Sequence, residues 1–206
     1  MQATKERKYT MFKIIAEIKE IEFDHVIDQM LELAKNHPQA GMQIPAFINA
    51  DMIKQMPQEM KNEMVVKALT AEKQKGIDML QNMAARMGIT MQVKSLLLEA
   101  PNTVECALRL QLEGSVAEYD RAIDVLMPRL LKEEQIPAIL GTSASAGITT
   151  AEAINVMKQK SETEKEFYLV KTLSLNKEIL KQELEQMAKL KNVALTMGVM
   201  RFMLPK

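Results

Sequence analysis

The sequence predicts an α+β protein in which four strands form a mostly antiparallel sheet with long helices on one face. Two observations lead to this fold class. Short segments that alternate apolar and polar residues, the period of a half-buried strand, are separated by longer segments whose apolar residues recur at helical spacing. The same order of segments also occurs twice along the chain. A sheet covered by helices on one face satisfies both patterns.

The internal repeat is the clearest feature of the sequence. Several short stretches of the first half have counterparts in the second half, in the same order. The closest pairs are FDHVIDQM at 23–30 with YDRAIDVL at 119–126, and VKALT at 66–70 with VKTLS at 170–174. We infer a tandem duplication, with residues 1–100 as the first repeat unit and 101–206 as the second. We expect the two units to share one core as a single domain.

Each unit is expected to begin and end with a strand. Alternation places these strands at 10–19 and 91–99 in the first unit, and at 103–113 and 193–202 in the second. Cys106 faces inward in the third strand, between apolar neighbours, where a thiol behaves as a small hydrophobe. The corner at residues 100–102, Ala-Pro-Asn, joins the two units as a turn.

Helices are expected between the two strands of each unit. Ser115 stands three residues before Glu118, the pattern of a capping box, and this predicts the start of the first helix of the second unit. A Gln-Ile-Pro-Ala segment occurs at 43–46 and again at 135–138. It leads into a short helix in each unit.

A long helix follows in each unit. It runs from about Pro57 to Met87 in the first unit, and from a capping box of Ser161 and Glu164 to about Leu190 in the second. About 28 residues span about 42 Å, twice the length of a first helix of about 14 residues. The long helices must therefore overhang. Because the overhanging turns carry apolar residues, they should pack on each other, on the short helices, or on another subunit.

The order of strands and helices is similar to that of a duplicated ferredoxin-like sheet. The likeness is one of topology. The order and direction of the strands stay open at this point, and a helical hairpin lying over a meander is the main alternative.

The composition indicates the cellular compartment of the protein and the classes of partner that it can bind. The chain has 27 Lys+Arg and 27 Asp+Glu, and neither half has the excess of positive charge that a nucleic-acid surface needs. The single cysteine favours a reducing cytoplasm. The polar and basic N-terminal stretch does not resemble a secretory signal, and no apolar stretch is long enough to span a membrane. We expect a soluble, cytoplasmic protein that binds no nucleic acid.

Methionine is unusually frequent, with 18 residues, and it forms two ladders at a spacing of four. The ladders comprise Met52, Met56, Met60 and Met64, and Met79, Met83, Met87 and Met91. Adaptable filling of the core is the simplest interpretation, because the thioether side chain is unbranched and flexible. A pliable groove for the apolar helix of a partner and a Cu(I) site built from thioethers are the other two.

The leading functional hypothesis is a non-enzymatic binding or assembly module. It would form a homo-oligomer and present its methionine-rich long helices to a protein partner, either a second copy or another protein. The residues expected at this contact are Met60, Met64, Val66, Leu69, Phe167, Val170 and Leu173. No catalytic, cofactor or metal motif is recognisable, so we expect none of these.

The alternative hypothesis is a small-molecule enzyme or sensor with a pocket between the two repeat units. Backbone amides of the small-residue loop at 140–147 could hold an anion. The paired aspartates at 24 and 28, and at 120 and 124, could hold a hard cation or act as acid and base. A connector loop and solvated helix starts are the simpler interpretations. The residues of this alternative site are Gly141, Ser143, Ser145, Gly147, Asp24 and Asp120, with Asp28 and Asp124 beside them.

Overall fold

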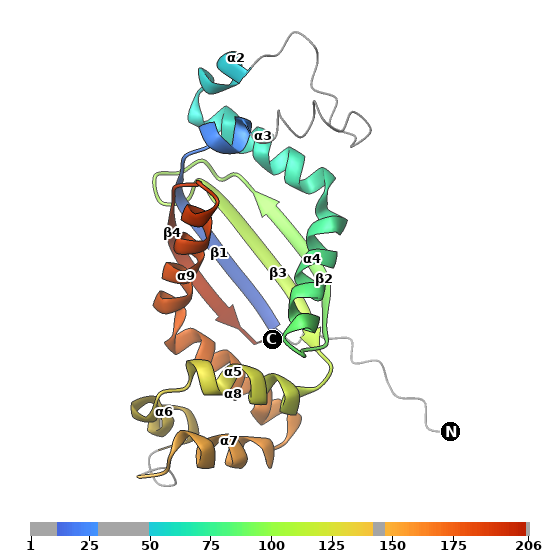
Figure 1. Ribbon diagram of the computed structural model, residues 1–206, viewed down its shortest axis with the longest axis vertical. Coiled ribbons are helices and arrows are strands. Elements are labelled where there is room, and N and C mark those ends of the chain that lie inside the picture. Colours follow the sequence, from blue (N-terminus) through green and yellow to red (C-terminus); the bar gives the residue numbers. More distant parts are fainter. Residues whose placement is uncertain (1–11, 29–49, 142–146, 205–206) are drawn as a thin grey trace, which may run out of the picture.

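The computed structural model describes residues 12–28, 50–141 and 147–204. Four strands form one antiparallel sheet in the order β2-β3-β1-β4. The strands are β1 (Phe12–Ile21), β2 (Met91–Glu99), β3 (Leu108–Val116) and β4 (Leu195–Met203). The expected α+β class with an antiparallel sheet is confirmed (Figure 1).

The strands of the two predicted repeat units are interleaved in this sheet. The first strand of each unit lies at the centre, where β1 pairs with β3 in a register that sets Ile14 opposite Leu112 and Ala16 opposite Leu110. The second strand of each unit lies at an edge, beyond the first strand of the other unit. This split order is that of a ferredoxin-like sheet and not of a meander.

One face of the sheet is apolar and faces the helices. Helices α4 (Lys73–Arg86) and α9 (Lys177–Leu190) run along the two edge strands on the same side of the sheet (Figure 1). Ile77 and Leu80 of α4 pack against Ile14 and Leu112 in the middle of the sheet. The expected helices on one face are therefore present.

The opposite face of the sheet carries ion pairs that cross between strands. Arg109 of β3 pairs with Glu17 of β1 at 2.9 Å and with Glu99 of β2 at 3.6 Å. Lys13 and Glu113 pair at 2.9 Å between β1 and β3. The hydrogen bond to Glu17 raises the pKa of the Arg109 guanidinium. Alternating side chains thus divide the sheet into an apolar and a charged face.

The remaining helices lie beyond the ends of the sheet (Figure 1). Residues 24–28 are helical in the first unit. The other helices are α2 (Ala50–Lys54), α3 (Gln58–Ala71), α5 (Tyr119–Leu130), the 3₁₀ turn η1 (Glu133–Gln135), α6 (Ile136–Leu140), α7 (Thr150–Lys158) and α8 (Glu162–Leu175). The Gln-Ile-Pro-Ala segment at 135–138 opens α6, whereas its counterpart at 43–46 lies outside the described residues.

The prediction of one continuous long helix in each unit is wrong. Each predicted helix is divided into two helices of 14 residues, α3 and α4 at Glu72, and α8 and α9 at Asn176. The side chain of buried Asn176 donates to the carbonyl of Thr172 at 2.8 Å and exchanges hydrogen bonds with Gln135. Such side-chain bonds compete with the helical backbone pattern and bend the helix.

Because of these bends, α3 and α8 do not overhang the sheet as straight extensions. Helix α8 packs on α5, α6 and α7 around the fully buried residues Ile123, Met127, Ile136 and Met157. Val65 of α3 belongs to a smaller cluster with Phe23 and Ile27. The apolar residues of α3 and α8 therefore pack on shorter helices, which is one of the three arrangements expected from the sequence.

Two capping boxes begin helices, and one expected box does not form. The side chain of Ser161 accepts from the backbone N–H of Glu164, and that of Thr149 accepts from Glu152, each with the reciprocal bond in place. The box expected at Ser115 is wrong, because β3 continues through this residue, which pairs with Gln92. Strand β3 also begins later than expected, at Leu108 and not at residue 103, so Cys106 precedes the strand.

Side chains of α4 and α9 make equivalent contacts with the two edge strands. Gln81 Oε1 accepts a hydrogen bond from the backbone N–H of Val93 at 2.9 Å. Glu185 Oε1 accepts one from the N–H of Met197 at 2.7 Å. The duplication and the division into units at residue 100 stay predictions from the sequence, and these recurring contacts agree with them.

None of the helices in the described part of the chain combines the length and apolar character needed to cross a lipid bilayer.

We predict that Ser161→Ala lowers the free energy of unfolding by about 1 kcal/mol at pH 7, because it removes the cap of α8. The Ser161 hydroxyl and N–H hold the pKa of Glu164 below its usual value, so their stabilising effect is present above pH 4.5 and is lost as the pH falls through the lowered pKa. Urea titrations at pH 7 and pH 3 should therefore show a smaller cost at pH 3. Thr163→Ala, an exposed change in the same turn, is the control. An equal cost at both pH values would contradict the role of Glu164.

Candidate functional site

An apolar cavity of about 280 Å³ is lined by residues from both halves of the chain, 12–91 and 116–173. Leu80 and Met83 of α4, with Met87 at its C-terminal cap, form one wall, and Leu169 and Leu173 of α8 form another. The remaining lining residues come from β1, the start of β2, the end of β3 and helix α5, and include Ile14, Met91, Val116 and Ala122. The cavity is larger than engineered cavities of roughly 150 Å³ that bind benzene.

The cavity arises where the C-terminal end of α4 meets α5. Gly88 ends α4 with a φ of 78°, and its carbonyl accepts a hydrogen bond from Arg121 Nε at 3.2 Å. A Cβ at this position would lie 2.6 Å from an Arg121 nitrogen, so glycine permits both the turn and the close approach. This contact joins the turn after α4 to the first turns of α5, beside the cavity-lining residues Met87 and Ala122.

The cavity wall has few polar groups. Glu166 of α8 contributes a carboxylate and Tyr119 of α5 a phenol. None of the described residues that line the cavity is Lys, Arg or His. A neutral apolar molecule is therefore the ligand that this wall suits, since an anionic head group would meet a carboxylate and no positive charge.

Three of the four methionines of the second ladder line this cavity. Met83 and Met87 lie on one face of α4 and are 44% and 42% exposed, so they form the rim. Met91 lines the same cavity from the start of β2, although the helix has ended at Arg86. Met79 faces away, into a shallow cleft with Lys75 and Asp78. In the first ladder, Met52, Met60 and Met64 are exposed, and Met56 packs against the Phe23 cluster.

The residues expected at a protein contact fall into two groups. Val170 and Leu173 line the apolar cavity, and Val66 is partly buried against the Phe23 cluster. The others are exposed on α3 and α8, namely Met60, Met64, Leu69 and Phe167. The Lys171 ammonium lies 5.0 Å from the centroid of the Phe167 ring. The structure therefore does not bring this set together on one surface.

The four aspartates of the alternative site are all paired with lysines. Asp24 pairs with Lys61 at 3.2 Å and Asp28 with Lys54 at 2.7 Å in the first unit. Asp120 pairs with Lys165 at 2.5 Å and Asp124 with Lys158 at 2.9 Å in the second. The hydrogen bond that Lys54 donates to Asp28 raises the pKa of Lys54. Each pair ties the first helix of a unit to a later helix.

The small-residue loop is described only at its ends. Gly141 and Gly147 are exposed with positive φ, and Ser143 and Ser145 lie outside the described residues. Gly141 borders a shallow cleft of about 570 Å³ together with Phe167, Lys171 and Leu204. The aspartates of the alternative site do not line this cleft, so the structure separates the two parts of that site.

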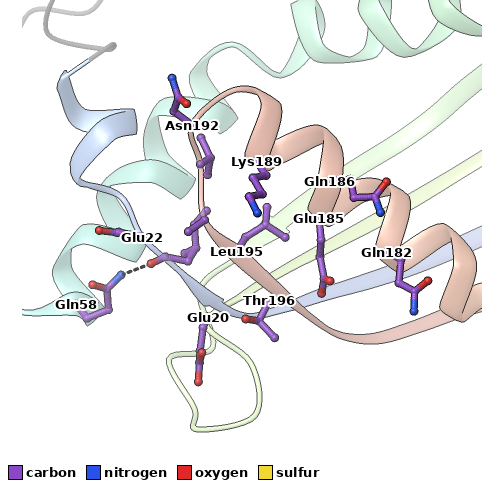
Figure 2. Close-up of a pocket in the computed structure, with 13 residues that line it drawn as sticks. Glu20, Glu22, Gln58, Gln182, Glu185, Gln186, Lys189, Asn192, Leu195 and Thr196 are labelled. Atoms are coloured by element: carbon purple, nitrogen blue, oxygen red, sulfur yellow. Dashed lines mark hydrogen bonds between the residues drawn. The ribbon is translucent and has the colours of Figure 1, made fainter.

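A larger cleft, of about 1030 Å³, lies at the corner between β1, β4 and α9 (Figure 2). Its walls carry amides such as Gln182 and Gln186, and the carboxylates of Glu20 and Glu22. Two of its polar side chains serve the fold, since Gln58 donates to the carbonyl of Ile21 and Glu185 accepts from Met197. A ligand in this open cleft would compete with water for each hydrogen bond, whereas the apolar cavity gains from removing apolar surface from water.

Cys106 is buried, and its Sγ donates to the carbonyl of Leu108 at 3.3 Å. Burial raises the pKa of the thiol, which keeps it protonated. Within the described ranges, no three His, Cys, Asp or Glu side chains are grouped so that they could hold a metal ion.

Comparison with known proteins adds no candidate, since no family model, curated protein or solved structure matches the chain. The apolar cavity is therefore the candidate functional site. Sequence reasoning missed Ala84, Tyr119, Ala122 and Glu166 in its wall. The spacing of Leu80, Met83, Ala84 and Met87 on one helical face was the signal that could have indicated the α4 side of it.

We predict that Ala84→Leu, which adds side-chain volume toward the cavity, leaves the urea midpoint unchanged or raises it. Ala153→Leu in α7 adds the same volume at a fully buried position that lines none of the cavities described above, and should cost about 1–3 kcal/mol. Both alanines are buried in helices, so helix propensity is matched. Equal destabilisation by the two changes would show that the space beside Ala84 is not free.

Proposed function

We propose that the protein is a non-enzymatic binding module that takes up a small, neutral, largely apolar molecule in the cavity between α4, α5 and α8. The observation that carries this proposal is the composition of the cavity wall, in which apolar side chains surround about 280 Å³ and, among the described residues, Glu166 and Tyr119 are the polar members. Sites of this kind gain affinity from burial of apolar surface and take orientation from a few polar groups.

The two repeat units would act together in this function. Met83 and Met87 come from the first unit, while Leu169 and Leu173 come from the second. A bound molecule would therefore contact both units and stabilise the arrangement of α4 against α8. The flexible thioethers at the rim allow the cavity to adapt to ligands of different shape.

We predict that naphthalene, a neutral bicyclic hydrocarbon, binds with a Kd on the order of 10–100 µM, from roughly ten buried carbons at about 0.6 kcal/mol each. Isothermal titration calorimetry measures the Kd, and thermal unfolding should shift upward with ligand concentration. Ala84→Leu should weaken binding by about tenfold or more. Ala85→Leu, at the neighbouring exposed position of α4, is the matched control and should leave the Kd unchanged.

Two results would contradict the proposal. One is the absence of any heat or thermal shift with naphthalene. The other is equal affinity in the Ala84→Leu and wild-type proteins, which would place the ligand elsewhere.

A second candidate function is assembly through the exposed apolar residues of α3, with a second copy of the chain as the partner. The exposure of large apolar side chains on this helix supports it, since Met60 is 51% and Leu69 48% exposed. Another protein at the same surface is the further form of this hypothesis.

For this assembly we predict a mass above the 23.3 kDa of one chain in size-exclusion chromatography with light scattering. Leu69→Glu with Met60→Glu should return the protein to a single chain, because charges would then lie in the apolar contact. Leu190→Glu, at an exposed leucine of α9 outside this surface, is the control. The mass of one chain at every concentration tested would exclude self-assembly.

A further inference from the structure

The methionines of this protein differ sharply in their access to solvent. Met127 and Met157 are fully buried in the cluster formed by α5 to α8. Met83 and Met87 are 44% and 42% exposed and also line the apolar cavity. Their side chains therefore contact the interior of the cavity and remain open to molecules in solution.

We propose that Met83 and Met87 are sites of oxidation by hydrogen peroxide, and that their sulfoxides close the cavity to apolar ligands. This inference rests on the proposed function of apolar-ligand binding and adds a means of regulating the same site.

The chemistry needs only the peroxide as a second reactant. A lone pair of the thioether sulfur attacks one peroxide oxygen, the O–O bond breaks, and an S–O bond forms. Proton transfer then releases one molecule of water. The sulfur is oxidised by two electrons and the peroxide is reduced by two, and the product is methionine sulfoxide.

The effect on the cavity follows from the polarity of the product. A sulfoxide is polar and chiral, whereas the thioether is flexible and apolar. An apolar ligand seated against Met83 and Met87 would lie against polar sulfoxide oxygens, for which the adjacent α4 residues of the cavity wall, Leu80 and Ala84, offer no hydrogen-bond donor. We expect affinity for naphthalene to fall by about tenfold or more after oxidation.

If these thioethers contact the ligand, a bound ligand should in turn protect them from oxidation. A molecule in the cavity covers Met83 and Met87 and should slow their oxidation. It should not protect Met60, which is 51% exposed on α3 and lies outside the cavity.

The test treats the full chain with hydrogen peroxide and follows each methionine by peptide mass spectrometry, with the naphthalene Kd measured before and after. Met83 and Met87 should oxidise faster than Met127 and Met157, and naphthalene should slow the first pair alone. In the Met83→Leu and Met87→Leu double variant, the Kd measured after peroxide treatment should equal the Kd of the same variant measured before it, whatever the starting value. A Met60→Leu and Met79→Leu double variant keeps both rim thioethers and should lose affinity like the wild type.

The outcomes separate this inference from the function on which it rests. Absence of naphthalene binding before oxidation would overturn the proposed function, and this inference with it. Binding at an unchanged Kd after Met83 and Met87 have been converted would overturn this inference alone. The same holds if Met127 and Met157 oxidise as fast as the rim pair in protein that is still folded.

Discussion

The pairing of β1 with β3 at the centre of the sheet is the constraint on which the rest of the structure depends. With the first strand of each unit in the middle, the second strand must lie at an edge, beyond a strand of the other unit. The helices that connect the strands of one unit must then cross over the other unit. Helices α4 and α9 end up above opposite edges of the sheet, and the α5 to α8 cluster includes Ala84 at the C-terminal end of α4 and Ile89 in the turn after it. The apolar cavity lies at this meeting point.

Long-range ion pairs hold the helices in this arrangement. In each unit two aspartates of the first helix reach lysines of later helices, as Asp24 reaches Lys61 and Asp120 reaches Lys165. Both lysine side chains are largely covered, whereas the aspartates are half exposed. Such pairs add modest stability and fix the direction in which one helix crosses another. Carboxylates that resemble ligand groups in the sequence thus serve the packing of helices.

The sequence predicts the local features of this fold well, because they depend on neighbouring residues. The alternation in MQVKSLLLE places β2 at Met91–Glu99, and Gly88 ends α4. The sequence-based predictions fail where residues distant in the sequence determine the local structure. Ser115 has the spacing of a cap, yet its pairing with Gln92 keeps it in β3. At the bend at Asn176, the side chain of this residue is hydrogen-bonded to Gln135, which lies 41 residues earlier in the sequence. The cavity could not be predicted, since its walls belong to both units and only the α4 side has a recognisable spacing.

The hydrogen bonds from Val93 and Met197 to side chains of α4 and α9 have a consequence for how the sheet can grow. Each of these amide groups lies on an edge strand beside an irregularity in the ladder, and each is already engaged by Gln81 or Glu185. An extended segment from another molecule would have to displace the helix side chain before it could add as a fifth strand, and the irregular register would misalign its remaining bonds. Both edges of the sheet therefore resist the addition of a strand from another molecule.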